Sequence, residues 1–151
     1  VARYREVMLE KHDDMIGIFP GIREVLNNLK QEGLRLGVVS TKRSDVLKRG
    51  VSILGITDYF DTIIGSGDFA RPKPDPESLF LAMDQLGAER ETSVMVGDNH
   101  HDIVAGNNAG ITSIFVGWSE KTTAFIQPYQ PTKIVKNPHE LEEYILSGVR
   151  V

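Results

Sequence analysis

Short apolar segments alternate with amphipathic segments along most of the chain, and this alternation constrains the fold more than any other feature. Five segments have the length and composition of buried strands: 34–39, 62–64, 93–96, 112–116 and 133–135. Between them, apolar residues recur at helical spacing, as Ile22, Val25, Leu26 and Leu29 do, and a further helix is expected at 103–109. Strands that alternate with helices form right-handed βαβ units. The sequence therefore predicts an α/β fold with a largely parallel sheet.

The N-terminal segment precedes this alternation. Residues 2–16 place apolar side chains at helical spacing, among them Tyr4, Val7 and Met8. We expect a helix here, which belongs either to the core or to a neighbouring small domain.

Composition excludes several classes of protein. Hydrophobic residues make up 40% and charged residues 25% of the 151, the balance of a folded globular domain. The net charge of −4 and the lack of a long basic run argue against a nucleic-acid partner. With no cysteine there is neither a thiolate metal site nor a cysteine nucleophile. No apolar run approaches the roughly 20 residues of a membrane span, so we expect a cytoplasmic protein.

Polar residues follow the predicted strands. Ser40 and Thr41 end the first, Lys73 lies in the segment after the second, and Asp98 and Asp102 follow the third. Open α/β sheets bind ligands beyond the carboxyl ends of their strands. We therefore expect hydroxyls, an ammonium and two carboxylates to meet at one edge of the sheet.

The two carboxylates have the pattern of a magnesium site. Asp98 comes directly after Gly97, and Asp102 falls in the first turn of the next helix, so both side chains can point back to the strand end. Neighbouring carboxylates repel unless a cation lies beside them, and Mg²⁺ prefers such hard oxygen ligands. The alternative is that Asp98 caps the helix while Asp102 only interacts with its dipole.

Lys73 is flanked by Pro72 and Pro74, which restrict the backbone on both sides. An ammonium held in this way can neutralise a phosphate oxygen and an attacking carboxylate together. Taken alone, the same pattern also describes a surface lysine in a proline-rich loop. Ser40 and Thr41 can bind phosphate oxygens, but Ser and Thr also commonly finish strands. The adjacent His100 and His101 are interpreted as a solvent-facing or substrate-facing pair rather than as zinc ligands.

The order of these motifs resembles that of the haloacid dehalogenase superfamily. The motifs are V-V-S-T-K at 38–42, R-P-K-P-D-P at 71–76, V-G-D-N-H-H-D at 96–102 and A-G-N-N-A-G at 105–110. The chain looks most like the phosphoglycolate phosphatase branch and the similar bacterial pyrophosphatases. The resemblance implies a three-layer Rossmann-like core.

The resemblance also implies roles for individual residues. Ser40, with Thr41 beside it, would bind the phosphoryl oxygens, and Lys73 would stabilise nucleophile and phosphate. Asp98 would bind Mg²⁺ directly, and Asp102 would orient the water shell of the metal. The implied partners are a small phosphorylated substrate or pyrophosphate.

One motif of the superfamily is missing. Its members begin with Asp-x-Asp on the central strand, where the first aspartate is the nucleophile and the second the general acid and base. No two aspartates here are separated by a single residue. We therefore expect the core to lack its central strand. Residues 1–17 would then be the last helix of an otherwise absent helical cap, and residues 18–151 would be the core.

The predicted function is Mg²⁺-dependent hydrolysis of a small phosphate ester or pyrophosphate through an aspartyl-phosphate in the full-length protein. This chain alone is expected to be inactive, with strand exchange or a separate N-terminal segment filling the sheet. A phosphomutase remains open. So does a non-catalytic subunit that binds phosphate and Mg²⁺. A phospho-receiver domain is set aside, because receivers place the acidic pair on the first strand and the lysine on the last.

Overall fold

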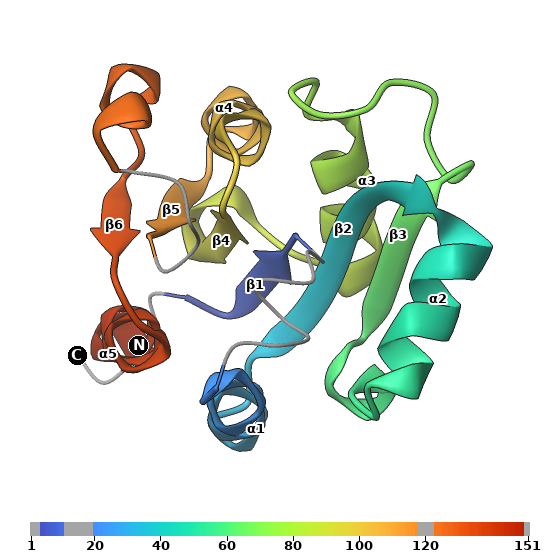
Figure 1. Cartoon of the computed structure of the whole chain (residues 1–151), viewed down its shortest axis with the longest axis horizontal. Coiled ribbons are helices and arrows are strands. Elements are labelled where there is room, and N and C mark those ends of the chain that lie inside the picture. Colours follow the sequence, from blue (N-terminus) through green and yellow to red (C-terminus); the bar gives the residue numbers. More distant parts are fainter. Residues whose placement is uncertain (1–3, 11–19, 118–122, 150–151) are drawn as a thin grey trace.

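A six-stranded parallel sheet forms the centre of the molecule (Figure 1). The computed structural model describes residues 4–10, 20–117 and 123–149. Along the sheet the strands follow the order β3-β2-β1-β4-β5-β6. Their bounds are Glu6–Leu9 for β1, Arg35–Arg43 for β2, Thr62–Ser66 for β3, Ser93–Gly97 for β4, Thr112–Val116 for β5 and Lys133–Val135 for β6.

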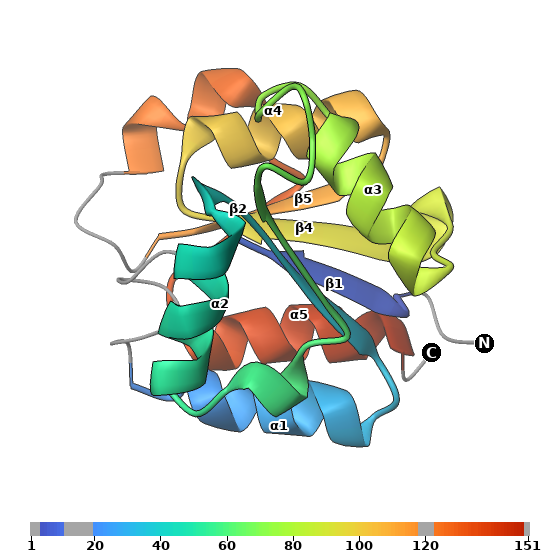
Figure 2. The ribbon, with the colours of Figure 1, turned by 90° about the vertical axis from the view of Figure 1, so that its right-hand side faces the viewer.

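Helices cover both faces of the sheet, so the fold has three layers. The helices are α1 (Ile22–Gln31), α2 (Ser44–Ile53), α3 (Glu77–Leu86), α4 (His100–Ala109) and α5 (Pro138–Val149), with short 3₁₀ turns at Thr57–Tyr59, Arg90–Thr92, Thr123–Phe125 and Gln127–Tyr129. Buried residues of α1, α2 and α5 share one apolar cluster, and those of α3 and α4 share another on the opposite face (Figure 2). The predicted α/β class and Rossmann-like core are confirmed.

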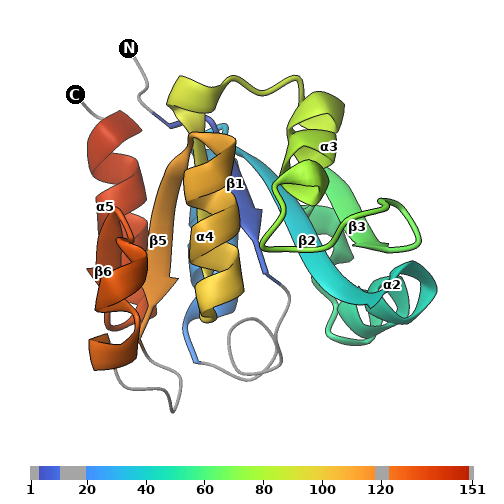
Figure 3. The ribbon, with the colours of Figure 1, turned by 90° about the horizontal axis from the view of Figure 1, so that it is seen from above.

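The sheet has no gap at its centre, and here the sequence-based expectation is wrong. β1 lies between β2 and β4 and pairs with both in parallel (Figure 3). Residues 6–9 thus form a strand and not a helix, and among the described residues no open edge remains inside the sheet for another segment to fill. The rest of the predicted helix, 11–16, and the proposed boundary at residue 17 lie outside the described residues. The division into cap and core stays a prediction.

The side chains of β1 show why a strand forms here. Val7 and Leu9 pack into the cluster with α1 and α5, whereas Met8 points to the opposite face with α3 and α4. This alternation has a period of two, as a strand requires. A short apolar run does not distinguish a doubly buried strand from a helical segment. Burial on both faces of the sheet decides the outcome, because it removes more apolar surface from water than one helix face would.

The amino end of β1 is anchored by polar contacts. Glu6 is 1% exposed; it pairs with Arg35 at the start of β2 and accepts a hydrogen bond from Thr92 Oγ1 at 2.8 Å. Backbone bonds join Arg5 N to Thr92 O at 2.7 Å and Arg35 N to Arg5 O at 2.8 Å. These contacts fix the register, so that Leu9 at the end of β1 lies beside Val96 near the end of β4 and beside Val38, from which β2 continues to Arg43.

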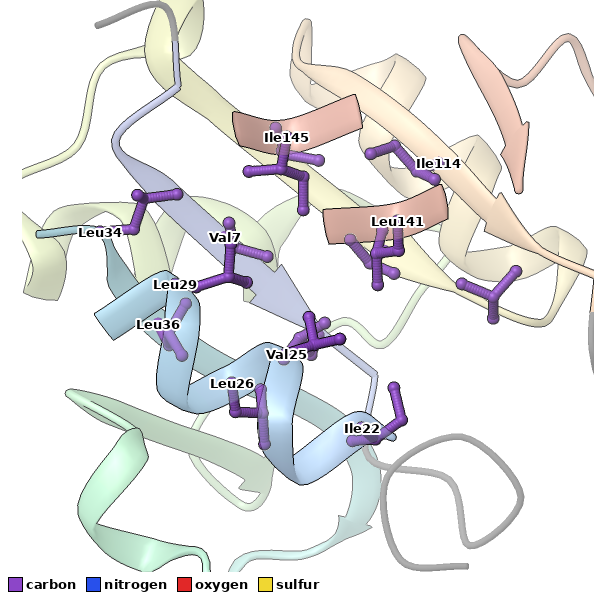
Figure 4. Packing of buried hydrophobic residues seen from close by; sticks show 14 of the residues in the cluster. Val7, Ile22, Val25, Leu26, Leu29, Leu34, Leu36, Ile114, Leu141 and Ile145 are labelled. Carbon is purple, nitrogen blue, oxygen red and sulfur yellow. The ribbon is translucent and has the colours of Figure 1, made fainter. Parts of the chain in front are cut away.

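The larger apolar cluster lies beneath the sheet. Figure 4 shows Val7 of β1 and Leu36 of β2 facing Val25 and Leu29 of α1, with Leu141 and Ile145 of α5 alongside. On the opposite face α4 approaches the sheet closely. A Cβ at Gly106 would lie 3.2 Å from the Cβ atoms of both Met95 and Ser113.

The remaining predicted elements are present, with shifted ends. The strand expected at 34–39 runs on to Arg43, and the helix expected at 103–109 begins earlier, at His100. Among the described residues, none of the helices has the length and apolar character needed to cross a membrane.

Candidate active site

A cavity of about 210 Å³ opens at the carboxyl ends of the central strands. It is lined by Glu10, Thr41, Lys73, Asp98, Asn99, His101 and Asp102. A larger hollow of about 480 Å³ lies beside β3. Its two aspartates already accept backbone N–H bonds, Asp61 from Leu36 at 2.9 Å and Asp68 from Gly65 at 3.0 Å. The smaller cavity is therefore the better candidate, because it combines buried carboxylates with a buried ammonium.

The turn from β4 into α4 supplies the acidic pair. Asp98 and Asp102 are 1% and 2% exposed. Asn99 caps α4 by accepting from His101 N at 3.0 Å, and Asp102 Oδ2 accepts from Asn99 N at 3.2 Å, which completes a capping box. A Cβ at position 97 would overlap the Asp102 side chain, so only glycine fits there. The helix cap is Asn99, and Asp98 instead lines the cavity.

Lys73 is buried and has three acceptors around its ammonium. Nζ donates to Val39 O at 3.1 Å and to Asp102 Oδ1 at 2.8 Å. It also forms an ion pair with Glu10 Oε2. The side chain of Lys73 is 2% exposed. Nζ of Lys73 thus connects β2, α4 and the residue that follows β1.

Short-range hydrogen bonds hold the loop that carries Lys73. Asp75 N donates to Pro72 O at 3.0 Å, which closes a turn around Lys73, and the Lys73–Pro74 peptide bond is cis. The carboxylate of Glu77, at the start of α3, accepts from the backbone N–H groups of Ala70 and Arg71. The loop is therefore tied to α3 on one side and closed on itself on the other.

Burial strongly affects the charge of Lys73. It lowers the pKa of the Lys73 ammonium below the ordinary value for lysine, while the negative charges of Asp102 and Asp98 act in the opposite direction. The site therefore depends on its anions to keep this lysine charged. An added anion, such as a phosphoryl group, would favour the charged form further.

The two hydroxyl residues of β2 lie in different positions. Thr41 lines the cavity. Ser40 is 1% exposed, and its Oγ accepts from Lys42 N at 3.1 Å. Ser40 is not among the lining residues. The structure thus brings Thr41, Lys73, Asp98 and Asp102 together, while the hydroxyl of Ser40, the residue before Thr41, is directed into the turn.

Two lining residues were not predicted as site residues, Glu10 and Asn99, and a third, His101, was interpreted as facing either solvent or substrate. The sequence contained a signal for Glu10, because Val7-Met8-Leu9 followed by an acid repeats the pattern of Val94-Met95-Val96 before Gly97-Asp98. The helical spacing of Tyr4, Val7 and Met8 concealed this similarity. For Asn99, the signal was Asp102 three residues later, the spacing of a capping box.

The donor set suits a divalent cation. Glu10, Asp98 and Asp102 give the lining a negative excess over the single ammonium of Lys73, and a hard cation relieves such an excess. Across the described parts of the chain, no group of three or more His, Cys, Asp or Glu side chains has the geometry of a complete metal site. Mg²⁺ commonly uses one or two protein carboxylates and completes its shell with water and phosphate. Asp98 and Asp102 fit that pattern.

Known proteins resemble this chain over most of its length. The profile of the family described as haloacid dehalogenase-like hydrolase matches residues 1–116. The pyrophosphatase PpaX of Bacillus velezensis is 37% identical over 141 residues, which cover 93% of this chain and 65% of the relative. That of Oceanobacillus iheyensis is 37% identical over 137 residues, 91% of this chain and 64% of the relative. The chain thus spans a little under two thirds of the length of these relatives.

Solved structures show the same fold. A protein assigned as a phosphoglycolate phosphatase from Lactobacillus delbrueckii subsp. bulgaricus superimposes with a TM-score of 0.78 at 34% identity, over 84% of this chain and 53% of that one. A hydrolase of the same superfamily from Ehrlichia chaffeensis gives a TM-score of 0.74 at 28% identity, over 85% of this chain and 58% of that one.

Proposed function

Because the chain belongs to the haloacid dehalogenase-like hydrolase family, we propose that the full-length protein is a Mg²⁺-dependent phosphatase. Its substrate would be a small phosphate ester, similar to phosphoglycolate, or pyrophosphate. The observation that supports this best is the cavity that joins Thr41, Lys73, Asp98 and Asp102 at the carboxyl ends of parallel strands. Ligands of open α/β sheets bind at such edges.

Each residue has a role that follows from its chemistry. Lys73 would neutralise charge on the phosphoryl oxygens, held in place by its hydrogen bonds to Val39 O of β2 and Asp102 of α4. Thr41 would donate its hydroxyl to one of these oxygens, and Ser40 would shape the turn beside it. Asp98 and Asp102 would hold Mg²⁺, which when bound supplies further positive charge at the phosphoryl group.

The reaction also needs a nucleophile and a proton donor. In the proposed route, an aspartate attacks phosphorus, the leaving oxygen departs with a proton, and water then cleaves the aspartyl-phosphate. The sequence contains no Asp-x-Asp pair to supply these two groups. We therefore propose that the chain alone binds phosphate and Mg²⁺ but turns substrate over slowly or not at all. A cytoplasmic location stays a prediction.

The absence of that motif also favours a second candidate function. The chain would then be a non-catalytic subunit that binds phosphate and Mg²⁺ in a split protein. The two candidates differ in whether a longer product of the same gene hydrolyses phosphate esters.

The test is a phosphate-release assay with pyrophosphate, phosphoglycolate and a sugar phosphate, with and without Mg²⁺. The full-length gene product and this chain are compared side by side. We expect Mg²⁺-dependent release by the full-length protein, with loss of turnover in Asp98→Asn. Mg²⁺-dependent turnover by this chain alone would contradict the proposed inactivity, and full activity of Asp98→Asn would contradict the metal assignment.

A further inference from the structure

Glu10 lies at the centre of the site, at the carboxyl end of the central strand. It is 7% exposed, and its backbone N donates to Val96 O at 3.0 Å, so the residue continues the pairing of β1 with β4. Its side chain enters the cavity that also contains Thr41 and Asp98. A buried carboxylate in this position requires a partner, and that partner is Lys73.

The ammonium of Lys73 is enclosed by protein acceptors. An ammonium has three N–H donors, and Nζ faces three acceptors: Val39 O, Asp102 Oδ1 and Glu10 Oε2. A phosphoryl oxygen can therefore contact Lys73 closely only by replacing one of these three.

The three acceptors differ in how firmly they are held. Val39 O belongs to the backbone of β2, in the middle of the sheet. Asp102 lies in the first turn of α4, and its other oxygen accepts from Asn99 N at 3.2 Å. Glu10 has the longer side chain of the two acids, and among the described residues its carboxylate has no polar partner other than Nζ. Glu10 is thus the acceptor that can leave with the least disturbance of the fold.

We propose that Glu10 is an internal anion that occupies the phosphate position on Lys73 and is displaced when a phosphoryl group binds. The inference rests on the proposed function, since it requires phosphate to bind at Lys73. In the free protein, Glu10 keeps the buried ammonium paired and oriented. On binding, the phosphoryl oxygen takes over this pairing, so Glu10 acts as a positioning residue that lowers the apparent affinity for phosphate.

The first experiment measures the affinity of inorganic phosphate by titration calorimetry at constant Mg²⁺. Glu10→Gln keeps the size of the side chain but replaces the anion by a neutral amide, which competes less well for an ammonium. We expect phosphate to bind Glu10→Gln about tenfold more tightly than the unchanged chain, on the basis of one charge-assisted contact.

Glu6→Gln is the matched control. Glu6 is also a buried glutamate of β1, but it pairs with Arg35 and Thr92 at the opposite end of the strand. This variant reports any general effect of removing a charge from β1 or of loosening the strand. We expect its affinity for phosphate to equal that of the unchanged chain or to fall slightly.

A second measurement follows the carboxylates directly in the unchanged chain. Side-chain ¹³C signals of glutamate are recorded during a phosphate titration, and Glu10→Gln and Glu6→Gln assign the two resonances. Displacement predicts a shift of the Glu10 carboxylate signal that saturates together with binding, while the Glu6 signal stays in place.

The outcomes separate this inference from the function on which it rests. Tighter binding by Glu10→Gln together with the shift of the Glu10 signal supports the displacement. If phosphate binds the unchanged chain but Glu10→Gln binds equally or more weakly, or if the Glu10 signal does not move, the inference is wrong while the phosphate site stands. If phosphate binds neither protein, the proposed function fails, and the inference fails with it.

Discussion

The strands β1 and β4 are neighbours in the sheet, and each is followed directly by a carboxylate that lines the same cavity, Glu10 after β1 and Asp98 after β4. The two ends are built differently. After β4, a glycine, a capping asparagine and an aspartate at the third helical position fix the turn within six residues. After β1, the carboxylate is held through Lys73, more than sixty residues further along the chain.

This difference shows what local sequence can and cannot encode. The β4 end is determined by interactions between close neighbours, so its chemistry is recognisable in the sequence. The β1 end exists only because β2, β4 and the helices on both faces surround a four-residue segment. The comparison can be tested by substitutions in the two strands, in the turn after β4, and in the loop whose Lys73 contacts both Glu10 and Asp102.

The largest effect is expected from the packing of the two strands. Met8 and Met95 stand opposite each other in register, both are fully buried, and both face α3 and α4. Met8→Ala and Met95→Ala should each lower the free energy of unfolding by about 3 kcal/mol, because each leaves a cavity in the core. Denaturant unfolding measures both.

Val46→Ala is the control for this pair, since Val46 is 44% exposed. Its effect should stay within about 0.5 kcal/mol. If Met8→Ala resembled this control while Met95→Ala was costly, β1 would not be part of the sheet, and the comparison would fail.

The second prediction concerns the short-range contacts in the turn after β4. Gly97→Ala would place a methyl group on the Asp102 side chain. We expect a loss of stability of about 2 kcal/mol from overpacking and weaker phosphate binding, since Asp102 also holds Lys73. Gly106→Ala makes the same chemical change in α4, but its Cβ would meet only Met95 and Ser113. Gly106→Ala should cost stability and leave phosphate affinity unchanged; equal losses of affinity in both would contradict the account.

The third effect concerns the helix cap. Asn99→Ala removes the acceptor for His101 N and half of the capping box, so the stability should fall by about 1 kcal/mol. Asn27 is an exposed residue inside α1, and Asn27→Ala should be neutral or slightly stabilising, because alanine favours the helix interior. Thermal unfolding distinguishes the two. An Asn99→Ala variant as stable as Asn27→Ala would show that the cap does not hold this turn.

The smallest effect is expected in the loop that carries Lys73. Backbone N–H bonds from Ala70 and Arg71 hold the pKa of Glu77 below its ordinary value. The charged form therefore stabilises the folded loop. This contribution is fully present above the ordinary value of 4.5 and is lost as the pH falls through the lower folded pKa.

Glu77→Gln should thus be slightly less stable than the unchanged chain near neutral pH, and the difference should disappear in acid below the folded pKa of Glu77. Chemical unfolding over a range of pH values measures it. A difference that grew as the pH fell would contradict the assigned contacts.

Most of the fold could be predicted from the sequence, for reasons visible in particular elements. Helix α1 shows apolar spacing that leads directly to its buried face, and β4 is a continuous apolar run between a polar start and a glycine. Element ends were less well predicted: α4 begins at His100, because Asn99 caps it, and not at Ile103. Competing hydrogen bonds of this kind depend on side-chain orientation, which spacing alone does not give.

The candidate site was predicted in part for the same reason. Thr41, Lys73, Asp98 and Asp102 follow recognisable strands or lie in marked turns, and the structure gathers them around one cavity. Glu10 escaped prediction because Val7 and Met8 fit a helix as well as a strand, and only the surrounding sheet decides between them. Ser40 follows the right strand, but its hydroxyl turns toward Lys42 N.

The central claim is that a divalent cation and a phosphoryl group share the cavity lined by Lys73, Asp98 and Asp102. The most direct test titrates Mg²⁺ into this chain at increasing concentrations of inorganic phosphate and measures the affinity for Mg²⁺. The account predicts that phosphate tightens Mg²⁺ binding and that Mg²⁺ tightens phosphate binding by the same factor. A Mg²⁺ affinity that does not change with phosphate would place the two ligands at separate sites and contradict it.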